Sequence, residues 1–74
     1  MQPMTPEQQR RAFADRLQIE FDRARRDPVD LAPLCGIPRA YIERWLRGEG
    51  MPTAKAIGAL AQALNIPPER LSDN

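Results

Sequence analysis

Residues that start or stop helices divide this chain into short segments, and none of those segments alternates apolar and polar residues as a strand does. A side chain that can cap a helix N-terminus stands at three positions, twice with proline directly after it: Thr5-Pro6, Asp27-Pro28 and Thr53. Residues that accept the left-handed backbone of a helix C-terminus follow at three others: Gly36, Gly48 and Asn65. These boundaries predict an all-α fold, a compact bundle of four to five helices.

The expected helices cover residues 5–26, 27–35, 38–47 and 53–64, and residues 67–71 allow one further turn. Apolar side chains recur at helical spacing within these segments and form the candidate core: Phe13, Leu17, Phe21, Ala24, Ile42, Trp45, Leu46, Ile57, Leu60, Ala61, Leu64, Ile66 and Leu71. Pro33 lies well inside the second helix, where a proline removes one backbone hydrogen bond. We therefore expect a kink or a shortened helix there.

Length and composition favour a single soluble domain. With 74 residues the chain buries only about 60% of the surface that it exposes when unfolded, so residues 5–74 are predicted to form one domain after a disordered segment, residues 1–4. No apolar run reaches the roughly 18 residues of a membrane span, and the N-terminus lacks the apolar stretch of a signal peptide. Cys35 has no second cysteine to pair with, which favours the reducing cytoplasm.

Charge is informative through its distribution, because a net charge of +1 alone is a poor indicator of a nucleic-acid partner. Ten of the eleven cations are arginines, whose planar guanidinium suits bidentate contacts with phosphate or guanine. Three acidic residues interrupt the polar face of the first helix, which disfavours a membrane-surface or calmodulin-like helix: Asp15, Glu20 and Asp22. The sequence has no histidine, cysteine pair, glycine-rich phosphate loop or metal-ligand spacing, so we predict no enzyme, cofactor, metal site or small-molecule substrate.

Two short helices joined by a glycine-containing turn occupy the middle of the chain. The run from Leu31 to Gly48, LAPLCGIPRAYIERWLRG, followed by Pro52-Thr53, resembles the Cro and lambda-repressor-like (XRE-type) helix-turn-helix family. The resemblance extends over residues 27–71 and includes the later run AQALNI at 61–66. It implies that the helix at about 38–47 is a recognition helix that enters the major groove of double-stranded DNA.

The resemblance also implies which side chains meet the bases. Four residues on the outward face of the recognition helix are expected to reach base edges or their flanking phosphates: Arg39, Ala40, Glu43 and Arg44. Arginine can bond to guanine O6 and N7, alanine can touch a thymine methyl, and glutamate can accept from a cytosine amino group. Phosphate contact is the alternative for Arg39 and Arg44, and solvation is a further one for Arg39. Glu43 can instead be solvated or pair with Arg39 or Arg47.

Residues at the junction into the fourth helix are expected to bind DNA phosphates, because a helix N-terminus attracts anions: Arg47, Gly50, Thr53 and Lys55. The alternative is that Thr53 only caps the helix and that Lys55 is simply solvated. Pro28 and Pro38 stand where the family usually has a polar residue. Both prolines remove groups that family members often direct at phosphate.

Three further side chains each have an ordinary and a functional interpretation. Tyr41 and Trp45 lie among apolar residues at helical spacing, so we expect them to pack in or beside the core rather than to stack on bases. Cys35 has no basic neighbour in the sequence that would lower its pKa, so we expect a small buried residue rather than a redox sensor.

The predicted function is sequence-specific binding to double-stranded DNA by a bacterial or phage transcription regulator, most simply a repressor. One such motif reads few base pairs, so we expect a homodimer on two half-sites about 34 Å apart. The alternative is a protein-interaction module with the same fold that binds a polymerase subunit or, like an antitoxin, a toxin. That alternative predicts no salt-dependent binding to duplex DNA.

Overall fold

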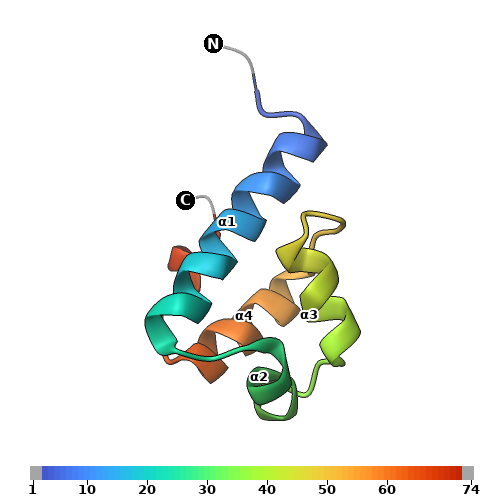
Figure 1. Cartoon of the computed structure of the whole chain (residues 1–74). Coiled ribbons are helices and arrows are strands. Elements are labelled where there is room, and N and C mark those ends of the chain that lie inside the picture. The colour runs from blue at the N-terminus through green and yellow to red at the C-terminus, as the bar shows by residue number, and fades with distance from the viewer. Residues whose placement is uncertain (1–2, 73–74) are drawn as a thin grey trace.

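The computed structural model describes residues 3–72, and that part of the chain contains helices and no strand. The elements are α1 (Pro6–Ala24), α2 (Pro28–Cys35), α3 (Arg39–Leu46), α4 (Ala54–Leu64) and a final 3-10 turn, η1 (Pro68–Arg70) (Figure 1). The prediction of an all-α bundle of four to five helices is confirmed. Of the segment expected to be disordered, residues 1–2 lie outside the described range, and residues 3–4 precede α1 without regular structure.

The helix starts follow the predicted caps. Thr5 accepts a hydrogen bond from the amide of Gln8 at 3.1 Å, while the Gln8 side chain accepts from the Thr5 amide at 2.9 Å, so the two form a capping box. Asp27 accepts from the Asp30 amide at 3.0 Å, and Thr53 accepts from the Ala56 amide at 3.1 Å. Each of these side chains satisfies an amide that the helix itself leaves without a partner.

The helix ends depend on left-handed residues. Gly36 (φ 71°) and Asn65 (φ 60°) terminate α2 and α4 as predicted, and Gly48 (φ 76°) follows the last turn of α3. The first helix ends slightly earlier than expected, at Ala24, because Arg25 adopts the left-handed conformation (φ 56°) although it is not glycine.

Pro33 does not shorten the second helix, so that one of the two expected effects is wrong. It is the sixth residue of α2, which continues through it to Cys35. Proline removes only the hydrogen bond that would reach the carbonyl of Val29, a residue that is 57% exposed, so water can reach that side of the helix. The amide of Gly36 then bonds to the Ala32 carbonyl at 2.9 Å and closes the helix normally.

The core contains apolar side chains from every α-helix and one from the C-terminal segment: Phe13, Leu17, Phe21, Leu31, Ile42, Trp45, Leu60, Ala61, Leu64 and Leu71. Leu46, Ile57 and Ile66 are partly buried against it. The predicted core is therefore largely confirmed, including the role of Leu71 and Ile66 at its base. Ala24 is exposed, because the apolar stripe of α1 has run past the core at that point.

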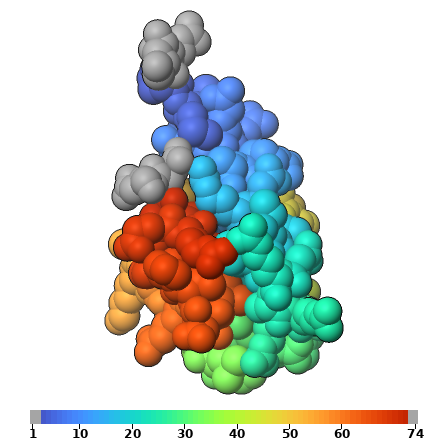
Figure 2. Space-filling model, turned by 90° about the vertical axis from the view of Figure 1, so that its left-hand side faces the viewer, coloured from blue at the N-terminus to red at the C-terminus, as the bar shows by residue number. Residues whose placement is uncertain are grey.

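Glu20 is buried, which is unexpected for a residue assigned to the polar face of the first helix. Its carboxylate lies 3.4 Å from the Arg70 guanidinium on η1 and 3.5 Å from that of Arg23 on α1. A buried charge is tolerated when opposite charges accompany it. The ion pair with Arg70 joins η1 to the C-terminal half of α1, and Figure 2 shows these two segments side by side.

The helices pack so that the shortest two, α2 and α3, share one corner of the molecule. These two helices contact each other, α4 supports α2, and α1 lies against α3 and α4. The N-terminal turns of α1 extend beyond the other helices (Figure 1), in a molecule that measures 39 × 23 × 22 Å. The outer sides of α2 and α3 are therefore left uncovered by other elements of the described chain.

The stability of α2 should depend on one side chain. Leu31 is its one fully buried residue, whereas Leu34 on the same helix is 56% exposed. We expect Leu31→Ala to reduce the free energy of unfolding by about 2–5 kcal/mol, a large fraction of what a domain this small possesses. Leu34→Ala should change it by less than about 0.5 kcal/mol. Urea denaturation followed by circular dichroism measures both, and equal losses would contradict this description of the core.

Candidate nucleic-acid interface

The connection between α2 and α3 is short and rigid. After the left-handed Gly36, two residues, Ile37 and Pro38, lead directly into α3. The side chain of Ile37 is partly buried against the core, so the turn is attached to the body of the protein. This arrangement of two packed helices with a tight glycine turn is the geometry of a helix-turn-helix.

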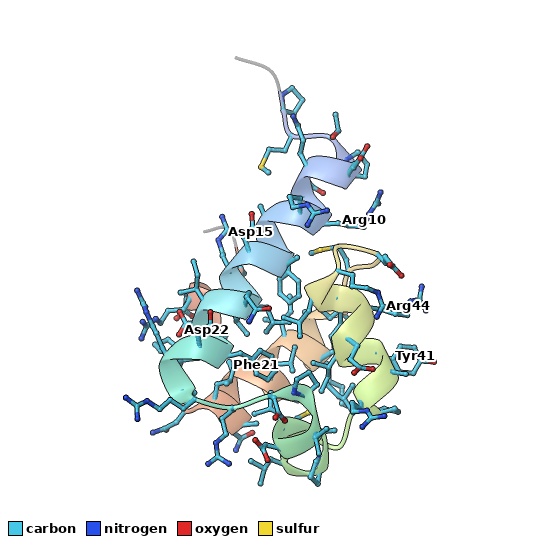
Figure 3. All side chains as sticks on the ribbon, viewed as in Figure 1. Arg10, Asp15, Phe21, Asp22, Tyr41 and Arg44 are labelled. Atoms are coloured by element: carbon cyan, nitrogen blue, oxygen red, sulfur yellow. The ribbon has the colours of Figure 1, made fainter. Side chains whose placement is uncertain are left out.

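The third helix turns one face into the core and the opposite face outward. Ile42 is fully buried and Trp45 is 8% exposed. The five residues expected to meet DNA on this helix and at its C-cap lie outside that buried pair and are exposed or half-buried: Arg39, Ala40, Glu43, Arg44 and Arg47. Figure 3 shows the side chain of Arg44 pointing away from the core. The structure therefore brings the four predicted base-contact residues together on one accessible surface.

Two of these residues form an ion pair. The Arg39 guanidinium lies 3.9 Å from the carboxylate of Glu43, one helical turn further on, and both side chains are about half exposed. This is one of the two pairings that the sequence allowed for Glu43. An exposed pair of this kind contributes little to stability, so both groups remain available to a ligand.

The four predicted phosphate contacts lie along the path from α3 into α4. Arg47 is the C-cap of α3, Thr53 is the N-cap of α4, and Lys55 lies exposed in the first turn of α4. Gly50 lies over the indole ring of Trp45, since a β-carbon at Gly50 would be 3.6 Å from the ring. The junction between the helices, residues 47–53, therefore packs at Gly50 on a core side chain, that of Trp45.

Arg47 already has an acidic partner that the sequence analysis did not identify. Its guanidinium donates to the two carboxylate oxygens of Glu49 at 2.9 and 3.4 Å. This hydrogen bond lowers the pKa of Glu49 below its ordinary value and raises the pKa of Arg47. A carboxyl with a lowered pKa loses its charge only in acid, so the pair persists throughout the neutral range.

The two aromatic residues of α3 behave differently. Trp45 packs in the core, whereas Tyr41 is 49% exposed and lies beside the core, the second of the two placements expected for these rings. The reason is its position on the helix, about 100° from Ile42, at the boundary between the buried and exposed faces. Its ring centroid lies 6.3 Å from that of Trp45, with 35° between the ring planes.

Cys35 is neither fully buried nor exposed. The thiol is partly buried against the core and donates to the Ala32 carbonyl at 3.7 Å. No group of three or more Cys, Asp or Glu residues within residues 3–72 is arranged to hold a metal ion. In the same range, no helix has the length and apolar character needed to cross a membrane.

The starts of α2 and α3 differ from the start of α4 in what they offer to an anion. At α2, the cap Asp27 and the first-turn residue Asp30 are both acidic and exposed, and at α3 the N-cap Pro38 makes no side-chain hydrogen bond. The N-terminus of α4 has no acidic residue in its first turn and carries Lys55 there. A phosphate is therefore favoured at α4 and repelled at α2.

Arg11 on α1 lies beside this surface although it stands outside the helix-turn-helix. A β-carbon placed on Gly48 would be 3.5 Å from the guanidinium carbon of Arg11. Arg11 could not be predicted as part of this surface from the sequence, because no pattern within α1 relates it to a turn so distant along the chain. Glu7 and Asp15 line the same shallow hollow, so the local charge there is mixed.

Comparison with known proteins gives one result that agrees with this geometry. A family model described as helix-turn-helix matches residues 27–71, which is more than half of the chain and covers α2, α3, α4 and η1. A search of curated proteins finds no match. The matched range contains the turn at Gly36, the exposed face of α3 and the junction into α4. The chain therefore belongs to the Cro and lambda-repressor-like (XRE-type) helix-turn-helix family of DNA-binding transcription regulators.

Proposed function

We propose that this protein binds specific sequences in double-stranded DNA through α3 and represses transcription by occluding RNA polymerase. The observation that carries the proposal is that three arginines are exposed on α3 and at its C-cap, while the other face of the helix is anchored in the core: Arg39, Arg44 and Arg47. An α-helix of about 10–12 Å diameter fits the major groove of B-DNA, which is about 12 Å wide. Family membership supports the same docking.

Base recognition would begin at the N-terminal end of α3. Arg39 and Ala40 are exposed in its first turn, where Arg39 can bond to guanine O6 and N7 and Ala40 can touch a thymine methyl. Arg44 follows one turn later on the same face and binds either a base or a phosphate. Glu43 would accept from a cytosine amino group once its pairing with Arg39 is exchanged for the base.

Phosphate binding would come from the junction into α4. Four candidate contacts lie in succession along this junction: Arg47, the backbone near Gly50, the N-cap Thr53 and Lys55. The Thr53 hydroxyl is engaged with the Ala56 amide, and capping leaves its remaining hydrogen-bonding capacity for a phosphate. Since α2 begins with two carboxylates, the junction would supply most of the contacts with the DNA backbone.

A test of the function is selection from random DNA duplexes with the full chain. We expect recovery of a short palindromic motif with half-sites about 34 Å apart, because a symmetric homodimer presents two copies of α3. Light scattering of the protein with the recovered duplex should give two chains per duplex. Enrichment of no sequence, together with no salt-dependent binding to any duplex, would support a protein-interaction module instead. A non-palindromic motif bound by one chain would contradict only the dimer.

Substitutions should separate base recognition from phosphate binding. Arg39→Ala should reduce discrimination between the selected site and a site changed at one guanine by about 1–3 kcal/mol, because the bidentate contact is lost. Lys55→Ala should weaken binding to all duplexes alike and reduce the slope of log affinity against log salt by about 0.9. Titrations on both duplexes at several salt concentrations measure these effects. An equal loss on both duplexes for Arg39→Ala would contradict its assignment to a base.

Glu49 should oppose DNA binding. It holds the guanidinium of Arg47 and adds a negative charge where a phosphate would approach. We expect Glu49→Gln to raise the affinity for duplex DNA by about two- to fivefold near 0.1 M salt, and by less at higher salt because exposed charges are screened.

Glu69→Gln is the matched control for this substitution. It makes the same change in net charge on the exposed side of η1, away from α3. The control should change affinity by less than about twofold. Equal effects of the two substitutions would show that net charge, not the pair with Arg47, sets the affinity.

A further inference from the structure

We infer that Tyr41 is an uncharged phosphate-binding residue of the DNA interface, its hydroxyl donating a hydrogen bond to the DNA backbone beside α3. The inference rests on the proposed function, since it requires α3 to lie in the major groove. It starts from the exposure of Tyr41 at the edge of the core.

The exposure of Tyr41 sets it apart from the other large aromatic residues of the protein. Phe13, Phe21 and Trp45 are at most 8% exposed, whereas the Tyr41 side chain is 49% exposed on the same short helix that buries Ile42. Figure 3 shows the side chain pointing away from the core, on the same side as Arg44. A large aromatic residue at the surface with a polar tip is characteristic of a contact position, where one end is apolar and the other is solvated.

The ring is also held in place. Its centroid lies 6.3 Å from that of Trp45, at an interplanar angle of 35°, and Trp45 is itself fixed in the core. Aromatic pairs at such distances attract each other. A side chain ordered before binding loses less conformational entropy when it contacts a ligand. The hydroxyl of Tyr41 is therefore presented on a rigid support.

The position on α3 determines what the hydroxyl meets. Successive residues of an α-helix are separated by 100°, so Tyr41 is one such step from Ala40 on the outward face and one from Ile42 on the inward face. The helix nearly fills the width of the major groove. Its outward face then meets base edges, and its flanks meet the sugar-phosphate backbones that form the walls. Tyr41 lies on a flank.

The chemistry fits a phosphate and not a base. Tyrosine is one of the side chains that donate to phosphate oxygens in protein–DNA complexes. Stacking on bases would require unstacked or single-stranded nucleotides, and α3 faces a closed duplex. The contact would also replace backbone anchors that this chain lacks, because Pro38 gives no side-chain cap at α3 and the acidic start of α2 repels phosphate.

The test is Tyr41→Phe, which removes the hydroxyl and keeps the ring. We expect a loss of affinity of about three- to tenfold, equal on the selected site and on a random duplex, because a backbone contact carries no sequence information. The salt slope should stay unchanged, since no cation has been removed. Lys55→Gln is the matched control, in which the loss of affinity comes with a slope reduced by about 0.9.

A contact between Tyr41 and a DNA phosphate differs from a structural or base-reading role in thermal stability and in binding. The thermal midpoint of Tyr41→Phe should equal that of the wild type, since the hydroxyl is not part of the core, and a lowered midpoint would make the residue structural. Wild-type affinity in Tyr41→Phe would overturn the inference while leaving the proposed function intact. A loss confined to the selected site would also overturn it, by making Tyr41 a base reader. Failure of the wild type to bind any duplex would overturn both.

Discussion

The structure depends on how two very short helices are held in the helical state. Helices α2 and α3 have eight residues each, and isolated helices shorter than about 12–15 residues are marginal in water. Their helicity therefore comes from burial of Leu31, Ile42 and Trp45 against α1 and α4. Because the inner faces alone supply this stabilisation, the outer face of α3 has no part in folding. Its side chains can vary with the DNA sequence to be read without loss of the fold.

The sequence predicted the features that are decided locally and missed those that depend on distant segments. A cap such as Thr5 or Asp27 bonds to an amide three residues away, so its pattern is complete in the sequence. The burial of Glu20 depends on Arg70, near the other end of the chain, and no local pattern contains that information. The exposure of Tyr41 was left open for a related reason, since helical periodicity assigns faces clearly but leaves a residue at their boundary undecided between core and surface.

The candidate interface combines arginines with carboxylates close beside them. Arg39 lies 3.9 Å from Glu43, and Arg47 donates to Glu49 at 2.9 Å. A ligand that binds either guanidinium must displace its carboxylate partner. The loss of that ion pair offsets part of the binding free energy. Such ion pairs lower the affinity for polyanions in general. They lower it less for a DNA site that also donates a hydrogen bond to the released carboxylate. The near-neutral charge of the chain is thus compatible with a protein that favours discrimination over strong general affinity for DNA.

Trp45 occupies a central place in this arrangement and is the one tryptophan of the chain. Its indole is 8% exposed, lies beneath Gly50 in the junction and contacts the ring of Tyr41. Indole emission shifts to longer wavelength when water reaches the ring, and it also responds to movement of neighbouring groups. The protein therefore contains an intrinsic fluorescent reporter at the point where the core meets the DNA-facing surface. The emission wavelength of Trp45 would report unfolding, and its emission intensity would report movement of the groups at the junction. Neither measurement requires an added label.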